Sequence, residues 1–294
     1  MRLSIRIIRG IAVTYIKLYK LLPMTKKVVN SYNPEFGYEL ISVLPYAYWL
    51  YKNGLLEKTI SGSDTYCLYY FSPNHEINPE QRSWYSGMTT SIIKLTADGV
   101  PNAFIHKSKL DMDRFLPPPY KEAYKNDWAK FNKPTFIIYN RYNNEWPENP
   151  SLNRPINFFS LELLDQVFQI LNKKYQVVYF NIEGTEELYD NAPPLHFPDY
   201  DLCRYHKVIH VKDLKEKHPG LTYNLIEMYY FANCQNFLTM NGGGGILASY
   251  FGGKNIIYTK KCKELQSGDF GYYHLFGGSE IKVVQTYEEI LENL

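Results

Sequence analysis

Residues 236–258 constrain the fold most, because they read as a strand, a glycine turn, a helix and a second strand in close succession. The apolar run 237–240 ends at Asn241, four consecutive glycines occupy 242–245, a helix of small residues follows, and a second apolar run covers 255–258. Strands that alternate with helices in this way are typical of a parallel sheet with right-handed crossovers. The sequence therefore predicts an α/β fold.

The glycine turn has two interpretations. Glycine has no Cβ, so the backbone can take positive φ angles and approach a ligand closely, while the N–H groups that begin a helix favour an anion. The alternative is a tight turn that only packs the helix against the strand. Four glycines in one ordered segment carry a large entropic cost. We therefore favour close approach of a ligand such as a diphosphate.

Length and composition restrict the classes of protein that are open to the chain. The 294 residues are enough for two ordinary domains, each with its own core. The net charge of +2 does not indicate a nucleic-acid partner. The four cysteines are widely spaced with no C-x-x-C pair, so neither a zinc site nor a disulfide framework is expected. A reducing, cytoplasmic compartment fits best.

The N-terminal segment, residues 1–23, predicts a basic amphipathic helix that Pro23 ends. Charges interrupt it too often for it to span a bilayer, and no small-residue cleavage site follows it. One interpretation of residues 2–22 is peripheral contact with an anionic membrane surface. The other is a helix that packs on the protein itself, and the sequence does not choose between them.

The first half of the chain, residues 24–133, predicts a strand at 27–32, a loop, and a helix from Leu40 to Gly54. Ligands of open α/β sheets sit at the carboxyl ends of strands, where this loop lies. Glu35 and Glu39 are therefore candidate catalytic acids or bases, and Gly37 would let the backbone approach an acceptor. The alternative for Glu39 is a carboxylate that only favours the helix N-terminus.

Further elements of the first half are less distinct. We predict a strand at 66–72, a strand at 103–106 and a bridging helix at 120–131. His75 follows the strand at 66–72 and is a candidate acceptor-side residue, although a lone loop histidine is more often plain surface. The three prolines at 117–119 break the chain before the predicted bridging helix, so the boundary between halves falls near residue 133.

The second half, residues 134–294, alternates strands and helices more regularly. Three of its polar clusters follow predicted strands and should meet at one edge of the sheet. Arg141 offers a planar fork suited to a diphosphate, although a surface ion pair with Glu145 is the alternative. The predicted donor-binding residues are Asn140, Arg141, Lys212, Asn241, Gly242, Gly243, Gly244 and Gly245. We expect strands at 135–139, 175–180, 208–211, 237–240, 255–258 and 281–284, and helices at 160–173, 222–234 and 287–294.

Two common nucleotide motifs are not matched. The P-loop pattern fails because Asn255 follows Gly253-Lys254, and the dinucleotide fingerprint fails because the four glycines come late in this half instead of after its first strand. These failures argue against a kinase and a dehydrogenase. No Asp-x-Asp follows a predicted strand, so we expect no metal and no other cofactor.

Three segments carry a resemblance to a known family: residues 241–252, residues 139–146 followed by 155–157, and residues 36–40 with Leu44-Pro45. Together they resemble two-domain glycosyltransferases of the GT-B type, particularly the heptosyltransferase-like and fucosyltransferase-like groups. The resemblance implies two Rossmann-like domains whose parallel sheets face each other across a cleft, with the donor on the second half and the acceptor on the first. It also implies that the helix at 287–294 returns toward the first domain. The chain departs from the family because its first loop has no clear histidine or aspartate base, so Glu35 or Glu39 would have to serve.

Three functions follow as hypotheses. The first is a metal-independent, inverting glycosyltransferase that moves a sugar from a nucleotide-diphosphate sugar to a glycan or other hydroxyl acceptor. The second is a non-catalytic α/β binding or scaffold module at a membrane surface. The third is another group transfer, such as sulfo transfer, that uses the same anion site.

Overall fold

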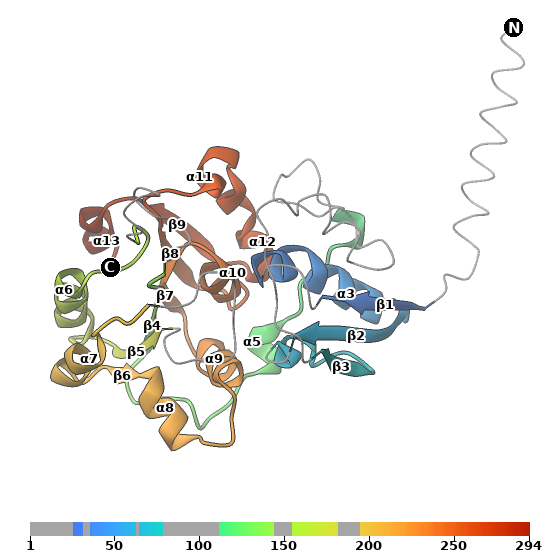
Figure 1. Cartoon of the computed structure of the whole chain (residues 1–294), viewed down its shortest axis with the longest axis horizontal. Coiled ribbons are helices and arrows are strands. Elements are labelled where there is room, and N and C mark those ends of the chain that lie inside the picture. The colour runs from blue at the N-terminus through green and yellow to red at the C-terminus, as the bar shows by residue number, and fades with distance from the viewer. Residues whose placement is uncertain (1–25, 32–35, 63–64, 79–111, 144–154, 182–194) are drawn as a thin grey trace, which may run out of the picture.

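The computed structural model describes residues 26–31, 36–62, 65–78, 112–143, 155–181 and 195–294 (Figure 1). The predicted N-terminal helix, the predicted strand at 103–106 and Glu35 lie outside these ranges. Within them, no helix has both the length and the apolar character needed to cross a membrane.

The second half forms a parallel sheet of six strands in the order β6-β5-β4-β7-β8-β9. Counted along this half, the strands lie in the order third, second, first, fourth, fifth and sixth, which is the Rossmann order. The order reverses between β4 and β7, and we call this place the switch point. The strands are β4 (Thr135–Asn140), β5 (Gln176–Asn181), β6 (Ile209–His210), β7 (Asn236–Met240), β8 (Lys254–Tyr258) and β9 (Glu280–Val284).

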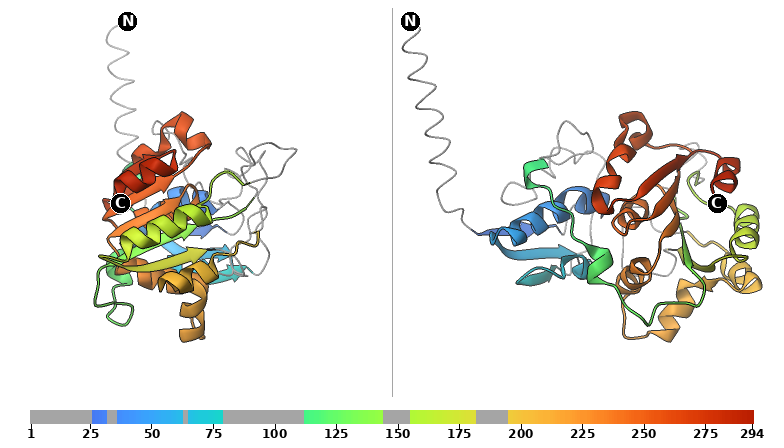
Figure 2. Two further views of the ribbon diagram at one scale, coloured as in Figure 1. Left: turned by 90° about the vertical axis from the view of Figure 1, so that its left-hand side faces the viewer. Right: turned by 180° about the vertical axis from the view of Figure 1, so that it is seen from behind.

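Both faces of this sheet are covered, which explains why its strands read as apolar runs. Side chains of a strand alternate between faces, so Phe136 and Ile138 of β4 join one apolar cluster and Ile137 and Tyr139 join the other. Figure 2 shows helices on both sides of the strands. The helices are α6 (Leu161–Leu171), α7 (Tyr200–His206), α8 (Val211–Lys217), α9 (Tyr223–Ala232), α10 (Gly243–Ser249), α11 (Lys263–Ser267), the 3₁₀-helix η6 (Asp269–Tyr272), α12 (His274–Gly277) and α13 (Tyr287–Asn293).

Two predicted helix starts of the second half are confirmed by capping contacts. The Ser160 hydroxyl accepts a hydrogen bond from the Leu163 amide at the start of α6, and Thr222 caps α9 in the same way through Leu225. The last helix, α13, stays with its own sheet, because Ile290 is fully buried in the cluster that contains Phe136 and Ile138. The expected return of this helix toward the first half does not occur.

The first half contains a parallel sheet of three strands in the order β1-β2-β3. The predicted strand at 66–72 is wrong: residues 66–69 form a 3₁₀-helix, and the strand β2 lies earlier, at 56–62. One continuous helical segment, 36–52, includes a π-helical stretch that begins at Glu39. The elements are β1 (Lys27–Asn30), α2 (Phe36–Tyr38), η1 (Glu39–Val43), α3 (Leu44–Lys52), β2 (Leu56–Gly62), η2 (Tyr66–Tyr69), β3 (His75–Asn78), η5 (Met112–Arg114) and α5 (Tyr120–Ala123).

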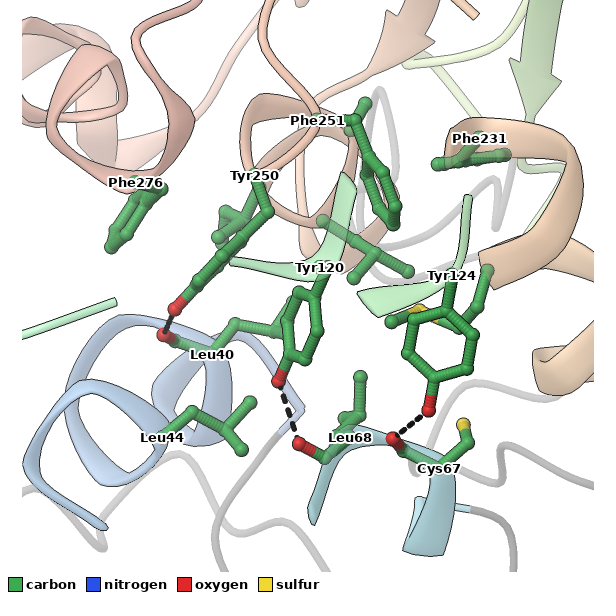
Figure 3. Close-up of a cluster of buried hydrophobic side chains, with 14 of the residues drawn as sticks. Leu40, Leu44, Cys67, Leu68, Tyr120, Tyr124, Phe231, Tyr250, Phe251 and Phe276 are labelled. Atoms are coloured by element: carbon green, nitrogen blue, oxygen red, sulfur yellow. Dashed lines mark hydrogen bonds between the residues drawn. The ribbon is translucent and has the colours of Figure 1, made fainter. Parts of the chain in front are cut away.

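A single apolar cluster joins the two sheets, and we call this region the junction. It contains Leu40 and Leu44 from the first half and Tyr250, Phe251 and other residues from the second. Figure 3 shows tyrosine hydroxyls that donate within the junction: Tyr250 to the Leu40 carbonyl at 2.5 Å, which joins the two halves, and, inside the first half, Tyr120 to the Leu68 carbonyl at 2.9 Å and Tyr124 to the Cys67 carbonyl. Buried hydroxyls with partners add direction to apolar packing.

The segment between the halves is part of the junction rather than a free linker. Its only described helix is the short α5, where the sequence predicts a helix over 120–131. Lys121 of α5 donates to the carbonyls of Phe251 at 2.8 Å and Cys234 at 3.3 Å, which lie just past the ends of α10 and α9. A cation at helix C-termini is favourable. The segment thus ties both helices to the first half.

Candidate functional site at the switch point

The switch point brings together two of the three predicted polar strand ends. β4 ends at Asn140 and β7 ends at Met240, and the two strands are hydrogen-bonded neighbours. Arg141 and Asn241 therefore follow adjacent strands at the carboxyl edge of the sheet. In open sheets of this type, ligands bind outside the carboxyl ends of the strands where the strand order reverses.

Arg141 lies directly against the first glycine of the turn. A Cβ built on Gly242 would stand 3.1 Å from the Nη1 atom of Arg141. Gly242 has φ of +112°, a conformation that side chains other than glycine rarely adopt. Arg141 is half-buried. The structure thus places a guanidinium beside the half-buried Gly242, while Glu145, the alternative partner of Arg141, lies outside the described residues.

At the other three glycines of the turn, neighbouring protein atoms fill the space that a side chain would need. A Cβ on Gly243 would stand 2.3 Å from the Phe36 ring, and one on Gly244 would stand 2.4 Å from the Tyr139 ring. A Cβ on Gly245 would meet the Met240 carbonyl oxygen at 2.7 Å. Close packing of helix and strand therefore explains these three positions, and the interpretation as a ligand cradle narrows to Gly242.

Asn140 is held within the protein. Its amide donates to the Phe159 carbonyl at 3.2 Å and to the Tyr179 hydroxyl at 2.9 Å, and its oxygen accepts from the Phe159 amide at 2.9 Å. These bonds hold the segment just before α6 against the end of β4. Asn140 therefore positions Arg141 from beneath, and its bonding capacity is almost fully used.

Asn241 differs from Asn140. It is 9% exposed, and among the described residues its Oδ1 atom has no hydrogen-bond donor. Its backbone amide donates to the Tyr258 carbonyl at 3.0 Å, which continues the sheet. Buried side-chain oxygens normally have a partner. Asn241 is therefore the member of the predicted set that retains bonding capacity beside Arg141.

Lys212 is not brought to the switch point. It is exposed on the first turn of α8, after the edge strand β6, and its ammonium lies 5.6 Å from the centroid of the Tyr200 ring. β6 is two strands away from β4, a lateral separation of about 10 Å. The prediction of Lys212 as a strand-end ligand overlooked α8, which begins immediately after His210.

In the first half, Glu39 is fully buried. Its Oε1 accepts from the Tyr69 hydroxyl at 2.6 Å and from the Ser31 hydroxyl at 2.8 Å, and these hydroxyls are 2.5 Å apart. Gly37 is buried in the short helix α2, one residue after Phe36. A general base must lie within hydrogen-bond reach of its substrate, so this arrangement suits a fixed structural acceptor better than a base.

His75 is the first residue of β3 rather than a loop residue. Its Nδ1 lies 2.7 Å from the Thr59 hydroxyl, its Nε2 lies 3.2 Å from the Ser61 hydroxyl, and its ring stacks on Tyr69 with centroids 5.2 Å apart. Burial lowers the pKa of His75 below its ordinary value, although the nearby Glu39 carboxylate opposes this. The structure thus joins two predicted residues, Glu39 and His75, through Tyr69.

A buried polar network beneath the same edge of the sheet was missed. Asp199 accepts from the Tyr179 hydroxyl and the Asn181 amide, both at 2.7 Å, and its other oxygen lies 3.6 Å from Nε2 of His210. Burial raises the pKa of Asp199, but the nearby His210 and the hydrogen bonds from Tyr179 and Asn181 outweigh burial and hold this pKa below its ordinary value. His210 Nδ1 accepts from the Lys212 amide and so caps α8.

The sequence offered one signal for this network, namely Asp213 three residues after His210. Its carboxylate accepts from the His210 amide at 3.0 Å and completes a capping box. Histidine is not among the usual capping residues, so the helix start was overlooked. Asp199 stands far from its partners in sequence and only the fold reveals it.

Fold and site together define a class: an α/β protein with a doubly wound parallel sheet and an arginine–asparagine–glycine group at its switch point. Within the described ranges, no group of three or more His, Cys, Asp or Glu side chains is arranged to hold a metal ion. Comparison of the chain with protein-family models, with curated proteins and with solved structures finds no match.

Proposed function

We propose that this chain is a glycosyltransferase that moves a sugar from a nucleotide-diphosphate sugar to a glycan or another hydroxyl acceptor. The observation that carries the proposal is the Arg141 guanidinium beside Gly242 at the switch point of the six-stranded sheet. This is the usual place for a nucleotide in sheets of this order. A guanidinium fork matches the oxygens of a phosphate group.

The chemistry assigned to Arg141 is stabilisation of the leaving group. Transfer breaks the bond between the anomeric carbon of the sugar and the diphosphate oxygen, and negative charge grows on that oxygen. N–H donors fixed in a half-buried place stabilise such charge more strongly than water does. Asn140 holds the backbone that carries Arg141, so the guanidinium is positioned before the donor binds.

The acceptor side is assigned to the first half. Phe36 packs on Gly243, so the segment that contains Gly37 lies next to the glycine turn. In a GT-B-like arrangement, donor and acceptor would meet beside this contact. The identity of the base stays a prediction: Glu35 lies outside the described residues, and Glu39 is bonded to Ser31 and Tyr69.

A donor screen tests the proposal. Purified protein is tested against a panel of nucleotide sugars for hydrolysis and for a rise in melting temperature, and at least one donor should give both signals. Arg141→Ala should lower donor affinity by roughly tenfold or more, since a charged hydrogen bond is worth about 1.5–3 kcal/mol.

The matched control is Arg204→Ala, which removes an exposed arginine of α7 in the same half and should leave donor affinity unchanged. No response to any nucleotide or nucleotide sugar would refute the proposal. A response to a sulfo donor alone would replace glycosyl transfer with sulfo transfer.

A further inference from the structure

Two asparagines stand on either side of the switch point, and among the described residues only Asn140 has a donor for its side-chain oxygen. Asn140 ends β4 and makes three hydrogen bonds inside the protein. Asn241 directly follows β7 and is 9% exposed, yet its Oδ1 receives no donor from the part of the chain that the structure describes. Because Tyr139 pairs with Thr239, Asn241 lies level with Arg141 and one residue beyond Asn140.

An amide oxygen buried without a donor destabilises the folded state. An apolar residue of the same shape would avoid this penalty at position 241. The next residue, Gly242, is the one that touches Arg141. The unused oxygen therefore belongs to the same small region as the guanidinium, which points to a ligand that supplies the missing donor.

The Arg141 guanidinium and the Asn241 Oδ1 atom have opposite hydrogen-bonding roles. Arg141 can only donate hydrogen bonds, and it suits phosphate oxygens, which accept. Asn241 Oδ1 can only accept, so a phosphate group without a proton cannot satisfy it. A ligand that satisfies both must carry a hydroxyl or an N–H close to its phosphate. In a nucleotide sugar, hydroxyls of the sugar rings lie nearer to the diphosphate than the base does.

We propose that Asn241 is a specificity residue whose Oδ1 accepts a hydrogen bond from a sugar hydroxyl beside the diphosphate held by Arg141. The inference rests on the proposed function and adds the part of the donor that is recognised. It distinguishes a sugar diphosphate from inorganic diphosphate, sulfate or any other anion that offers acceptors alone. The hydroxyl belongs either to the ribose of the nucleotide or to the transferred sugar.

The first test needs no ligand. Asn241→Leu keeps the branching of the side chain and removes the Oδ1 atom that lacks a donor, so its melting temperature should equal or exceed that of the wild type. Asn140→Leu is the matched control and should melt several degrees lower, because its partners are left unpaired. A clear fall for Asn241→Leu and also for the smaller Asn241→Ala would show that the amide is bonded in the free protein, and would overturn the inference.

The second test measures binding by calorimetry with UDP, GDP, CDP and ADP, with the matching nucleotide sugars, and with inorganic diphosphate. Asn241→Leu and Asn241→Ala should weaken the best nucleotide or nucleotide sugar about 5- to 10-fold and change inorganic diphosphate less than about twofold. Loss for the nucleoside diphosphate assigns the hydroxyl to ribose, whereas loss only for the nucleotide sugar assigns it to the transferred sugar.

The outcomes separate the two proposals. If the wild type binds none of these nucleotides or nucleotide sugars, the proposed function fails, and the inference fails with it. If the wild type binds one and both Asn241 variants bind it equally well, the inference fails alone. An equal loss for inorganic diphosphate would show that Asn241 acts on the phosphate and not on a sugar, and would also overturn it.

Discussion

Replacing Gly243 with alanine tests whether the glycine turn serves packing or ligand approach. The added methyl carbon would stand 2.3 Å from Cδ1 and 2.9 Å from Cε1 of Phe36, whose side chain is 7% exposed. Contact this short forces the ring or the backbone to move, and overpacking of this kind costs about 1–3 kcal/mol. Alanine would otherwise favour the helix α10 by up to about 1 kcal/mol over glycine. The net loss should be about 1–2 kcal/mol.

The assay is a double-mutant cycle with Phe36→Ala, in which urea unfolding measures the stability of each variant. Phe36→Ala alone should cost about 3–5 kcal/mol as a buried aromatic truncation. In that background the ring is gone, so Gly243→Ala should become neutral or stabilising by up to about 1 kcal/mol. The change of sign is the diagnostic result. Gly271→Ala, where no atom lies within 4 Å of the new carbon, is the control and should stay within about 0.5 kcal/mol.

An equal cost of Gly243→Ala in both backgrounds would show that the Phe36 ring is not what the methyl group meets, and would refute this prediction. A further result would restore the other interpretation of the turn. If Gly243→Ala leaves stability unchanged but abolishes nucleotide binding, the glycine is needed for close approach of the ligand.

Two further predictions concern the junction and the first sheet. Lys121→Met should lower the free energy of unfolding by about 2 kcal/mol in thermal melts, because the Phe251 and Cys234 carbonyls lose a charged donor. The control Lys125→Met removes an exposed lysine and should have little effect. His75 has a folded-state pKa below its ordinary 6.5, so between the two values the unfolded chain binds more protons and stability falls as the pH drops below about 6.5. His75→Gln should flatten the change in urea midpoint between about pH 7 and pH 5, whereas exposed His274→Gln should not, and an unchanged slope for His75→Gln would contradict this account.

The second sheet was predictable because its central strands are buried on both faces. All six residues of β4 are buried and mostly apolar, and Ser160 gives a standard helix cap, so pattern and chemistry agree. The meeting of Arg141 with the glycine turn also followed from the rule that parallel strands end at one edge. These features depend on local sequence and on a general topological rule.

The first sheet was harder because its signals conflict with its structure. Residues 66–71 are rich in aromatic side chains and imitate a strand, yet they form a turn of 3₁₀-helix whose Cys67 and Leu68 carbonyls accept from Tyr124 and Tyr120. A short apolar run cannot be assigned to strand or helix by its periodicity alone. The true strand, β2, carries Glu57 and Lys58 and lacks the expected alternation.

The residues of the candidate site were predictable, but which of them have hydrogen-bond partners inside the protein was not. Asn140 and Asn241 look alike in the sequence, since each follows an apolar run. Only the fold shows that Asn140 is saturated by Phe159 and Tyr179 while Asn241 is not. Likewise, the contacts of Gly243 and Gly244 come from Phe36 and Tyr139, which are distant in sequence. Long-range packing decides which polar residue is free.

The shared core at the junction also has a consequence for how this protein can be divided. Leu40, Tyr120 and Tyr250 come from three separate stretches of chain and are buried in the same apolar cluster. Cutting the chain near residue 133 would therefore expose apolar surface on both fragments. Neither fragment would be an independent module for exchange or fusion. The two sheets therefore have to be kept together in any fusion or domain exchange.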